Sequence, residues 1–359
     1  MASGVGSFGW APAHERTTGL ARNDWSKLDE SDVHVRPSKG TRPRSKRRPE
    51  HADAVNAMVI GKDRGRWTCA IDADPARVIT AMRAREMGRT PVVVGDRVAV
   101  VGDVSGKPDT LSRIVRVDER TSSLLRTADD TDPYERLVVA NAERLLIVTA
   151  LADPPPRTGF IDRCLVACYA GGVEPVLCLT KADLASPDEL LAGYAGLDIP
   201  VIFSRYDEQP EGLDELLKDR LTALVGHSGV GKSTLVNRLV PDADLAVGVV
   251  SGVGKGRHTS VAAVALPLPD GGWVIDTPGV RSFGLAHVTA DDIVDAFEEF
   301  AAAAEECPSG CGHLGPPEDP DCALDDVVTE GRAGAERLAS LRRLLTSRGG
   351  HEVTHVTEA

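Results

Sequence analysis

One short stretch of this sequence carries the residues needed to bind nucleotide phosphates. Residues 226–233 read GHSGVGKS, which matches G-x-x-x-x-G-K-[ST], and they lie between the apolar run LTALV and the helical pattern TLVNRLV. Glycines let backbone N–H groups turn towards the phosphates, and the following helix adds the positive end of its dipole. Lys232 would supply charge to the β- and γ-phosphates, and Ser233 a hydroxyl ligand to magnesium. The residues predicted to contact the nucleotide here are Gly226, His227, Ser228, Gly229, Val230, Gly231, Lys232, Ser233 and Thr234.

Two further segments offer what magnesium-dependent phosphoryl transfer requires. Asp276-Thr-Pro-Gly279 ends the apolar run GGWVI, where Asp276 can hold magnesium, directly or through water, and the Gly279 amide can meet the γ-phosphate. Thr259 is the candidate for a switch threonine that closes on magnesium, although a loop threonine is more often a turn residue. Val280 follows Gly279, and its apolar side chain cannot orient the attacking water. His258 is therefore a candidate for ordering that water, with an ordinary polar loop histidine as the alternative. We therefore expect slow intrinsic hydrolysis.

A third segment could specify the base. Thr180-Lys-Ala-Asp183 follows the apolar run VEPVLCL, and the Asp183 carboxylate can accept the guanine N1–H and amine, while the Lys181 stem covers the base. Thr180 stands where guanine nucleotide proteins usually have Asn, so we expect loss of an amide that would bond the base and brace the phosphate loop. Ser204, after the run VIF, is either part of a second base-contacting loop or a polar strand cap. An ATP-preferring enzyme remains the alternative.

The order of these segments is reversed relative to ordinary GTPases, because the base-specifying segment precedes the phosphate loop. A circularly permuted chain can build the same site where termini lie close together and loops tolerate the change. The segment after Asp276 then runs directly into the C-terminal region. Nucleotide state could thereby be transmitted mechanically to that region.

A cysteine and histidine cluster follows near the C-terminus. Three residues separate Cys307 from Cys311, and one residue separates Cys311 from His313. Eight residues (LGPPEDPD) then separate His313 from Cys322. Three thiolates and one imidazole make a closed tetrahedral zinc site of the structural kind, and buried or idle thiols are the alternative. The spacing is not C-x-x-C, so a redox pair is not expected. The cysteines outside the cluster are predicted to be core residues: Cys69, Cys164, Cys168 and Cys178.

The elements that must position these residues differ along the chain. Short β-rich runs between Val55 and Arg126, separated by Gly, Asp and Pro, predict a small five-stranded barrel of the OB type, with an SH3-like barrel as the alternative. From Leu137, apolar strands alternate with helical segments, which predicts an α/β domain with a parallel sheet. The helical segments are expected at 160–171, 187–195, 211–218 and 233–240. The barrel arginines that could meet phosphates, if they are not merely solvated, are Arg64, Arg66, Arg83, Arg85 and Arg89.

The tail from Thr289 is predicted to be helical around the cysteine loop. Four leucines recur there at helical spacing and are expected to pack inwards, whereas the neighbouring arginines are expected on a solvated face that could otherwise contact RNA. The leucines are Leu338, Leu341, Leu344 and Leu345, and the arginines are Arg337, Arg342 and Arg343.

Charge is distributed unevenly over the 359 residues. The net charge of -13 argues against a nucleic-acid partner, but residues 1–50 carry net +4, residues 51–127 net +3 and the rest net -20. The run RPSKGTRPRSKRR, with three prolines in and beside it, indicates a disordered basic arm or a solvated tail. The odd number of seven cysteines favours a reducing cytoplasm, and we expect neither an export signal nor a membrane helix.

The combination and order of these motifs, from about residue 52 to 345, resemble the RsgA/YjeQ family of circularly permuted GTPases. Phe160-Ile-Asp-Arg163 and Asn141 also look like the family's approach to the nucleotide domain. The family pattern generally has four residues between the first two cysteines and about five before the last, so this chain departs from both gaps. The resemblance implies GTP and GDP as ligands, GTP hydrolysis stimulated by the small ribosomal subunit, a role in its late maturation, and a monomer.

We therefore predict a cytoplasmic GTPase that uses magnesium and one structural zinc ion and engages the small subunit and its rRNA. The predicted parts are a basic arm (1–50), an OB-type barrel (51–127), a circularly permuted P-loop GTPase domain of α/β class (128–288), and a helical zinc-binding domain with a tail (289–359). An RNA-binding module whose nucleotide site is only regulatory is the alternative from another class of function.

Overall fold

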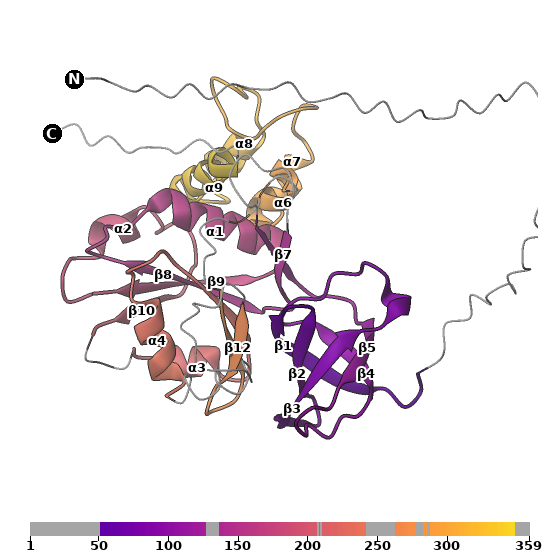
Figure 1. Cartoon of the computed structure of the whole chain (residues 1–359). Coiled ribbons are helices and arrows are strands. Elements are labelled where there is room, and N and C mark those ends of the chain that lie inside the picture. Colours follow the sequence, from indigo (N-terminus) through magenta and orange to yellow (C-terminus); the bar gives the residue numbers. More distant parts are fainter. Residues whose placement is uncertain are drawn as a thin grey trace, which may run out of the picture. The chain divides into compact units, whose positions relative to one another are not determined.

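The computed structural model describes residues 51–126, 136–206, 208, 210–241, 263–277, 283, 285 and 288–348 (Figure 1). They belong to one compact unit, Glu50–Ala359. The predicted basic arm of residues 1–50 lies outside the described residues, as do His258, Thr259 and Gly279. No helix in the described ranges has the length and apolar character needed to cross a membrane.

Five strands close into a barrel. They are β1 (Val55–Asp63), β2 (Arg66–Ile71), β3 (Asp74–Arg83), β4 (Arg97–Gly102) and β5 (Ser112–Val117). β1 pairs with both β2 and β4, and β3 runs parallel to β5, so the ring is ordered β1-β2-β3-β5-β4 and returns to β1. Alternate apolar side chains such as Val59, Cys69 and Ile114 fill its interior. The prediction of a five-stranded barrel is confirmed.

The start of β4 differs from the expected run, which began at Pro91. Asp96 is fully buried, and its carboxylate accepts the backbone N–H of Val93 (2.8 Å) and the guanidinium of Arg120 (2.7 Å). This local side-chain bond turns the backbone, as Asp side chains do in loops. The strand therefore begins only at Arg97.

A parallel sheet forms the centre of the second region. Its strands are ordered β10 (Val201–Ser204), β9 (Glu174–Thr180), β8 (Arg144–Ala150), β11 (Leu221–Val225) and β13 (Trp273–Asp276). The antiparallel β12 (Val264–Pro267) lies next to β13 in the sheet. A separate pair is formed by β6 (Ser123–Arg126) and β7 (Arg136–Ala140), which lie on opposite sides of the predicted domain boundary at residue 127. Neither β12 nor β6 was predicted.

Helices cover both faces of this sheet, as Figure 1 shows. Successive residues of β8 alternate between two cores: Leu145 and Ile147 face the core that includes α1 (Thr158–Gly171), whereas Leu146 and Val148 face the core of α3 (Leu213–Leu217) and α4 (Lys232–Leu239). Strands buried on both faces are typical of parallel sheets. The short α2 (Asp188–Ala192) completes the helices of this region, and the predicted α/β alternation is confirmed.

The barrel and the sheet share one hydrogen-bonded layer. β1 pairs with β12 at Gly61 and Val264. Because successive β1 side chains point to opposite faces, Ala57 and Val59 enter the barrel core while Met58 enters the core of the nucleotide region. β1 is therefore a strand of the barrel and also a packing surface for its neighbour.

The C-terminal region is helical, with α6 (Ala290–Val294), α7 (Glu298–Ala304), α8 (Leu324–Thr329) and α9 (Ala335–Arg348). α6 begins at a capping box, in which the side chains of Thr289 and Asp292 bond each other's backbone N–H. The leucine stripe of α9 is buried, as predicted, and each such leucine contributes roughly 2 kcal/mol. α9 packs against α1, so this region is joined to the nucleotide region by an apolar helix interface.

The arginines of α9 contradict the expectation of a solvated face. The side chains of Arg337, Arg342 and Arg343 are 24%, 21% and 18% exposed. Arg337 pairs with Glu299 and lies over the Phe297 ring at 4.8 Å. Each of these guanidinium groups is paired with an acidic side chain of another helix, and the helical spacing of the arginines alone could not indicate this.

Candidate functional site

The phosphate loop joins β11 to α4 at the carboxyl edge of the parallel sheet. Gly231 has a φ of 92°, a left-handed value that suits glycine, and it caps α4; Gly229 also has a positive φ. A Cβ at Gly226 would lie 2.5 Å from the Val148 carbonyl oxygen, so this glycine permits a close backbone approach. Ser228, Ser233 and Thr234 are exposed at the mouth of the loop. The described geometry therefore has the form that phosphate binding requires.

Lys232 and Asp276 approach each other from neighbouring elements. The Lys232 Nζ lies 3.3 Å from Oδ1 of Asp276, which ends β13 beside Leu224 of β11. Oδ1 of Asp276 is buried and makes no hydrogen bond within the described residues. The Lys232 ammonium and the Asp276 carboxylate are therefore an ion pair without a hydrogen bond. A buried carboxylate oxygen without a hydrogen bond and the exposed Ser233 hydroxyl are the oxygen donors that magnesium prefers. The residues present therefore fit a magnesium ion at this edge.

Thr277 is a residue that the sequence did not indicate. Its hydroxyl donates a hydrogen bond of 2.5 Å to the Leu224 carbonyl, and its side chain is buried. This bond ties the end of β13 to β11 immediately before the phosphate loop. Within the Asp-Thr-Pro-Gly segment, the Asp was singled out for its charge, whereas the Thr contributes through a contact that only the paired strands create.

The base-specifying segment lies against the phosphate loop. Thr180 ends β9 next to Ser204 of β10, and the backbone N–H of Ala182 donates to the Ser204 carbonyl at 3.3 Å. The Thr180 hydroxyl lies 2.5 Å from the Val230 carbonyl of the phosphate loop and 3.3 Å from the Thr149 carbonyl. The expectation that Thr180 loses the brace is therefore wrong, because its hydroxyl reaches the loop where an amide was expected.

The other residues predicted for the base differ in exposure. Asp183 is exposed, and Lys181 donates from its Nζ to the Asp153 carbonyl. The Ser204 side chain is only 6% exposed, and its carbonyl already accepts the Ala182 N–H. An exposed carboxylate is available to a ligand, whereas the contact of Ser204 with a base remains a prediction.

The His227 side chain is half-buried beside α1. Its ring packs on Phe160 of α1 at 4.4 Å between centroids. One turn along α1, Arg163 donates to the Phe283 carbonyl at 3.1 Å. α1 thus contacts the phosphate loop and the segment that follows Asp276.

α1 also holds α9 through a buried charge pair. Asp162 is 3% exposed and lies 3.3 Å from Arg343, whose guanidinium stacks 4.6 Å from the Tyr194 ring and donates to the Gly193 carbonyl. Burial raises the pKa of Tyr194 above its ordinary value. Asp162 and Arg343 therefore connect the nucleotide region to the C-terminal helices.

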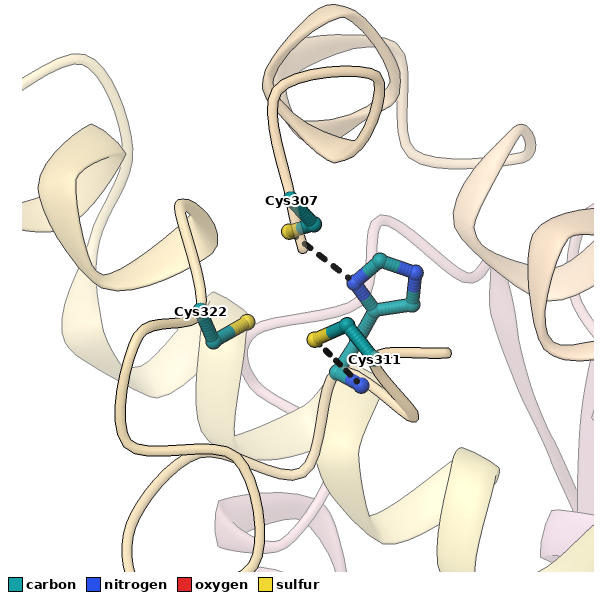
Figure 2. Close-up of side chains that lie close together, drawn as sticks. Cys307, Cys311 and Cys322 are labelled. Atoms are coloured by element: carbon teal, nitrogen blue, oxygen red, sulfur yellow. Dashed lines mark hydrogen bonds between the residues drawn. The ribbon is translucent and has the colours of Figure 1, made fainter. Parts of the chain in front are cut away.

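The predicted cysteine and histidine residues converge in space (Figure 2). One ligand atom from each of Cys307, Cys311, His313 and Cys322 lies within 4.8 Å of all the others. Nδ1 of His313 is 3.4 Å from Cys307 Sγ, and the His313 backbone N–H donates to Cys311 Sγ at 3.3 Å. Burial raises the pKa of the Cys311 thiol to about 12, so a cation would be needed to hold it as thiolate.

This donor set fits a zinc ion. Three sulfurs and one imidazole nitrogen are the donors of closed structural zinc sites. Nε2 of His313 points towards the carboxylate of Asp291 at 3.8 Å, the kind of partner that fixes the ring orientation of metal-binding histidines. The four remaining cysteines are buried and apart from the cluster, which confirms them as core residues.

Fold and sites together define a P-loop nucleotide-binding protein of the α/β class, in which the base-specifying strand end precedes the phosphate loop in sequence. Residues 117–286 match the profile of the RsgA GTPase family. A small ribosomal subunit biogenesis GTPase RsgA from Chlorobaculum parvum is 36% identical over 282 residues, covering 76% of this chain and 90% of that protein. The chain belongs to the RsgA GTPase family.

Other relatives agree with this assignment. The RsgA protein of Shewanella oneidensis is 37% identical over 272 residues, covering 72% of this chain and 75% of its own. Among solved structures, YjeQ from Thermotoga maritima is similar with a TM-score of 0.59 at 24% identity, over 83% of this chain and 99% of that one. YloQ, described as a circularly permuted GTPase, has a TM-score of 0.58 at 23% identity, over 84% and 98%. The fold is therefore that of circularly permuted GTPases.

Proposed function

We propose that this chain hydrolyses GTP as a late assembly factor of the small ribosomal subunit, that the subunit stimulates hydrolysis, and that hydrolysis favours release. The main structural support for nucleotide binding is the hydrogen bond between the Thr180 hydroxyl and the Val230 carbonyl, which joins the base-specifying segment to the phosphate loop. The assignment to the small subunit follows from relatives named small ribosomal subunit biogenesis GTPase RsgA.

In this proposal, catalysis depends mainly on positioning and charge. Backbone N–H groups of the phosphate loop and the Lys232 ammonium hold the phosphates, while Asp183 accepts the guanine N1–H. Ser233 and Asp276 would hold magnesium, together with Thr259, and the ion would neutralise charge on the phosphates. Gly279 would donate its amide to the γ-phosphate, and His258 would orient the attacking water.

We assign the barrel to the OB type and to rRNA binding. Its closed order β1-β2-β3-β5-β4 fits a five-stranded barrel of that type. Arg64, Arg66, Arg85 and Arg89 are exposed on it, whereas Arg83 donates to the Thr90 carbonyl at 2.7 Å. Exposed arginines attract phosphates even when the net charge is negative, because salt limits each charge's reach to about 8 Å.

The remaining parts follow the same proposal. Cys307, Cys311, His313 and Cys322 would hold one structural zinc ion that stabilises the C-terminal region. We retain the division at residues 50, 127 and 288, a monomeric state and a cytoplasmic location, since the small subunit is assembled there.

The decisive experiment measures GTP turnover with and without purified small subunits. Stimulated turnover supports the proposal, and turnover that does not respond to subunits contradicts it. Unchanged turnover combined with tight binding to generic RNA favours an RNA-binding module with a regulatory nucleotide site. Competition between GDP and ADP, monitored with a fluorescent GDP analogue, tests the base preference separately, because Asp183 should reject adenine.

A further inference from the structure

One carboxylate beside the cysteine cluster lies outside the predicted ligand set. Asp319 belongs to the eight-residue segment between His313 and Cys322, which is longer than the family pattern. Its Oδ1 accepts the Gly312 N–H at 3.1 Å, and its Oδ2 accepts the Leu314 N–H at 2.9 Å. The two oxygens of one side chain therefore hold the backbone N–H groups of the residues on either side of His313.

The backbone of His313 has an unusual conformation that needs such support. Its φ is 61°, in the left-handed region that is unfavourable for residues with a Cβ. Its carbonyl accepts a hydrogen bond of 3.2 Å from Nε of Arg342, and the other guanidinium nitrogens of Arg342 bind both oxygens of Asp325 at 2.8 Å. One backbone group of each of three consecutive residues, Gly312, His313 and Leu314, is thus fixed by Asp319 or Arg342.

This restraint determines where the imidazole points. The His313 side chain is 5% exposed, its Nδ1 faces Cys307, and its own backbone N–H faces Cys311. With the backbone fixed, the only freedom left to the ring is its two side-chain torsions. Outer contacts of this kind orient metal ligands, and their removal commonly weakens metal binding.

We propose that Asp319, supported by Arg342, is a positioning residue for a divalent cation at Cys307, Cys311, His313 and Cys322. It holds His313 in the left-handed conformation that directs Nδ1 into the cluster. The longer segment before Cys322 is then part of the metal site, because it supplies this carboxylate. The inference depends on the zinc site of the proposed function. The competing explanation is that Asp319 merely fastens a surface loop and leaves the ligands unaffected.

The test compares Asp319→Ala with Glu318→Ala in the full chain. Glu318 is the adjacent carboxylate, is exposed, and makes no hydrogen bond or ion pair within the described residues, so its removal is a matched control. Zinc affinity is measured by competition with a chromophoric chelator, and ligand geometry by the visible absorption of the Co²⁺-substituted protein. GDP affinity reports whether the nucleotide region is intact.

We expect Asp319→Ala to weaken zinc binding about 10- to 100-fold and to change the Co²⁺ spectrum, with GDP affinity unaltered. The zinc affinity of Asp319→Asn should fall between those of Asp319→Ala and the parent chain, because its one carbonyl oxygen can still accept an N–H. Glu318→Ala should match the parent chain. If Asp319→Ala is not recovered folded, Asp319→Asn carries the same comparison.

Two negative results are distinguishable. A parent chain that binds zinc, together with an Asp319→Ala variant of equal affinity and spectrum, overturns this inference and leaves the zinc site standing. A parent chain that binds neither zinc nor Co²⁺ removes the zinc site itself, and this inference with it. GTP turnover is independent of both results.

Discussion

The phosphate-binding edge and the cysteine cluster are held in place in different ways. The phosphate loop stands between strands whose side chains are buried on both faces, and Thr180 and Thr277 tie it to neighbouring strand ends. The cluster lies in the loop between α7 and α8, where no strand passes, and its internal contacts run between sulfurs, an imidazole and backbone N–H groups. One site is shaped by the core of the sheet, whereas the other is shaped by contacts within its own loop and with α9.

This difference indicates which site needs its ligand in order to keep its shape. A loop anchored by hydrogen bonds to a rigid sheet keeps its shape without a nucleotide. The cysteine loop packs on the apolar core of the C-terminal helices, and a bound cation would add cross-links between its thiols and imidazole, because metal binding is coupled to folding. Changes at the first site should therefore affect chemistry more than stability, and changes at the second should have the opposite effect.

The largest effect is expected for Lys232→Ala. Removing the charge at the phosphates should lower kcat/KM for GTP about 10²- to 10³-fold, while the thermal midpoint changes little. Lys218→Ala removes an exposed lysine at the end of α3 and serves as the control. Steady-state GTP hydrolysis and thermal unfolding measure the two quantities. If Lys232→Ala lost much stability but kept its turnover, the phosphate site would not be the one at which changes affect chemistry more than stability.

Removal of the metal should show the opposite pattern. Chelation, or Cys322→Ser, should increase proteolysis between residues 305 and 323 about 10²-fold, since the loop loses its cross-link. GDP affinity should stay within about twofold. Limited proteolysis with mass mapping and a GDP titration measure these effects. Equal protection with and without metal would show that the loop is held by its protein contacts alone.

Arg343→Ala tests whether the two regions act as one body. It removes the guanidinium that lies 3.3 Å from the buried Asp162 carboxylate and should reduce the free energy of unfolding by about 2 kcal/mol, which is less than the loss for a fully buried pair because Arg343 is partly exposed. Arg332→Ala breaks an exposed pair with Glu330 and should cost less than about 0.5 kcal/mol. Urea unfolding compares them. Similar small losses in both would mean that α9 is joined to α1 by apolar packing alone.

The smallest effect is expected for Thr180→Ala. Loss of the bond to the Val230 carbonyl should weaken GDP binding about tenfold, and Thr180→Ser should retain most of the affinity. Thr222→Ala is the matched control, because this buried β11 threonine hydroxyl has no hydrogen-bond partner among the described residues. Titration with a fluorescent GDP analogue measures both. Unchanged affinity in Thr180→Ala would remove Thr180 as a brace.

The residues that converge at each site were largely predictable from local pattern. The phosphate loop, Asp276 and the four cluster residues were recognised because their chemistry depends on residue type and spacing over a few positions. The strands beneath them were predictable because strands buried on both faces leave continuous apolar runs. β6 and β12 were not predicted, whereas β10 and β13, which are as short, were predicted because each ends at a polar residue that was itself a site candidate, Ser204 or Asp276.

Contacts between distant segments were not predictable in this way. Thr180 was expected to lose its brace, yet its partner Val230 lies fifty residues away in the phosphate loop. The α9 arginines were expected in solvent, but their acidic partners lie on α1, α7 and α8. Asp319 carried no signal of its own, because an acidic residue in a proline-rich loop is ordinarily a solvated one.

The sequence by itself determined which chemical groups this chain brings to phosphate, base and metal, because motif spacing is a local property of the backbone. The tertiary structure alone decided which groups hold those motifs in place. Burial leaves Thr180 little water as an alternative hydrogen-bond partner, and Arg343 and Asp319 meet their partners wherever packing brings them. That packing is set by the whole sheet and its helices, and no local pattern encodes it.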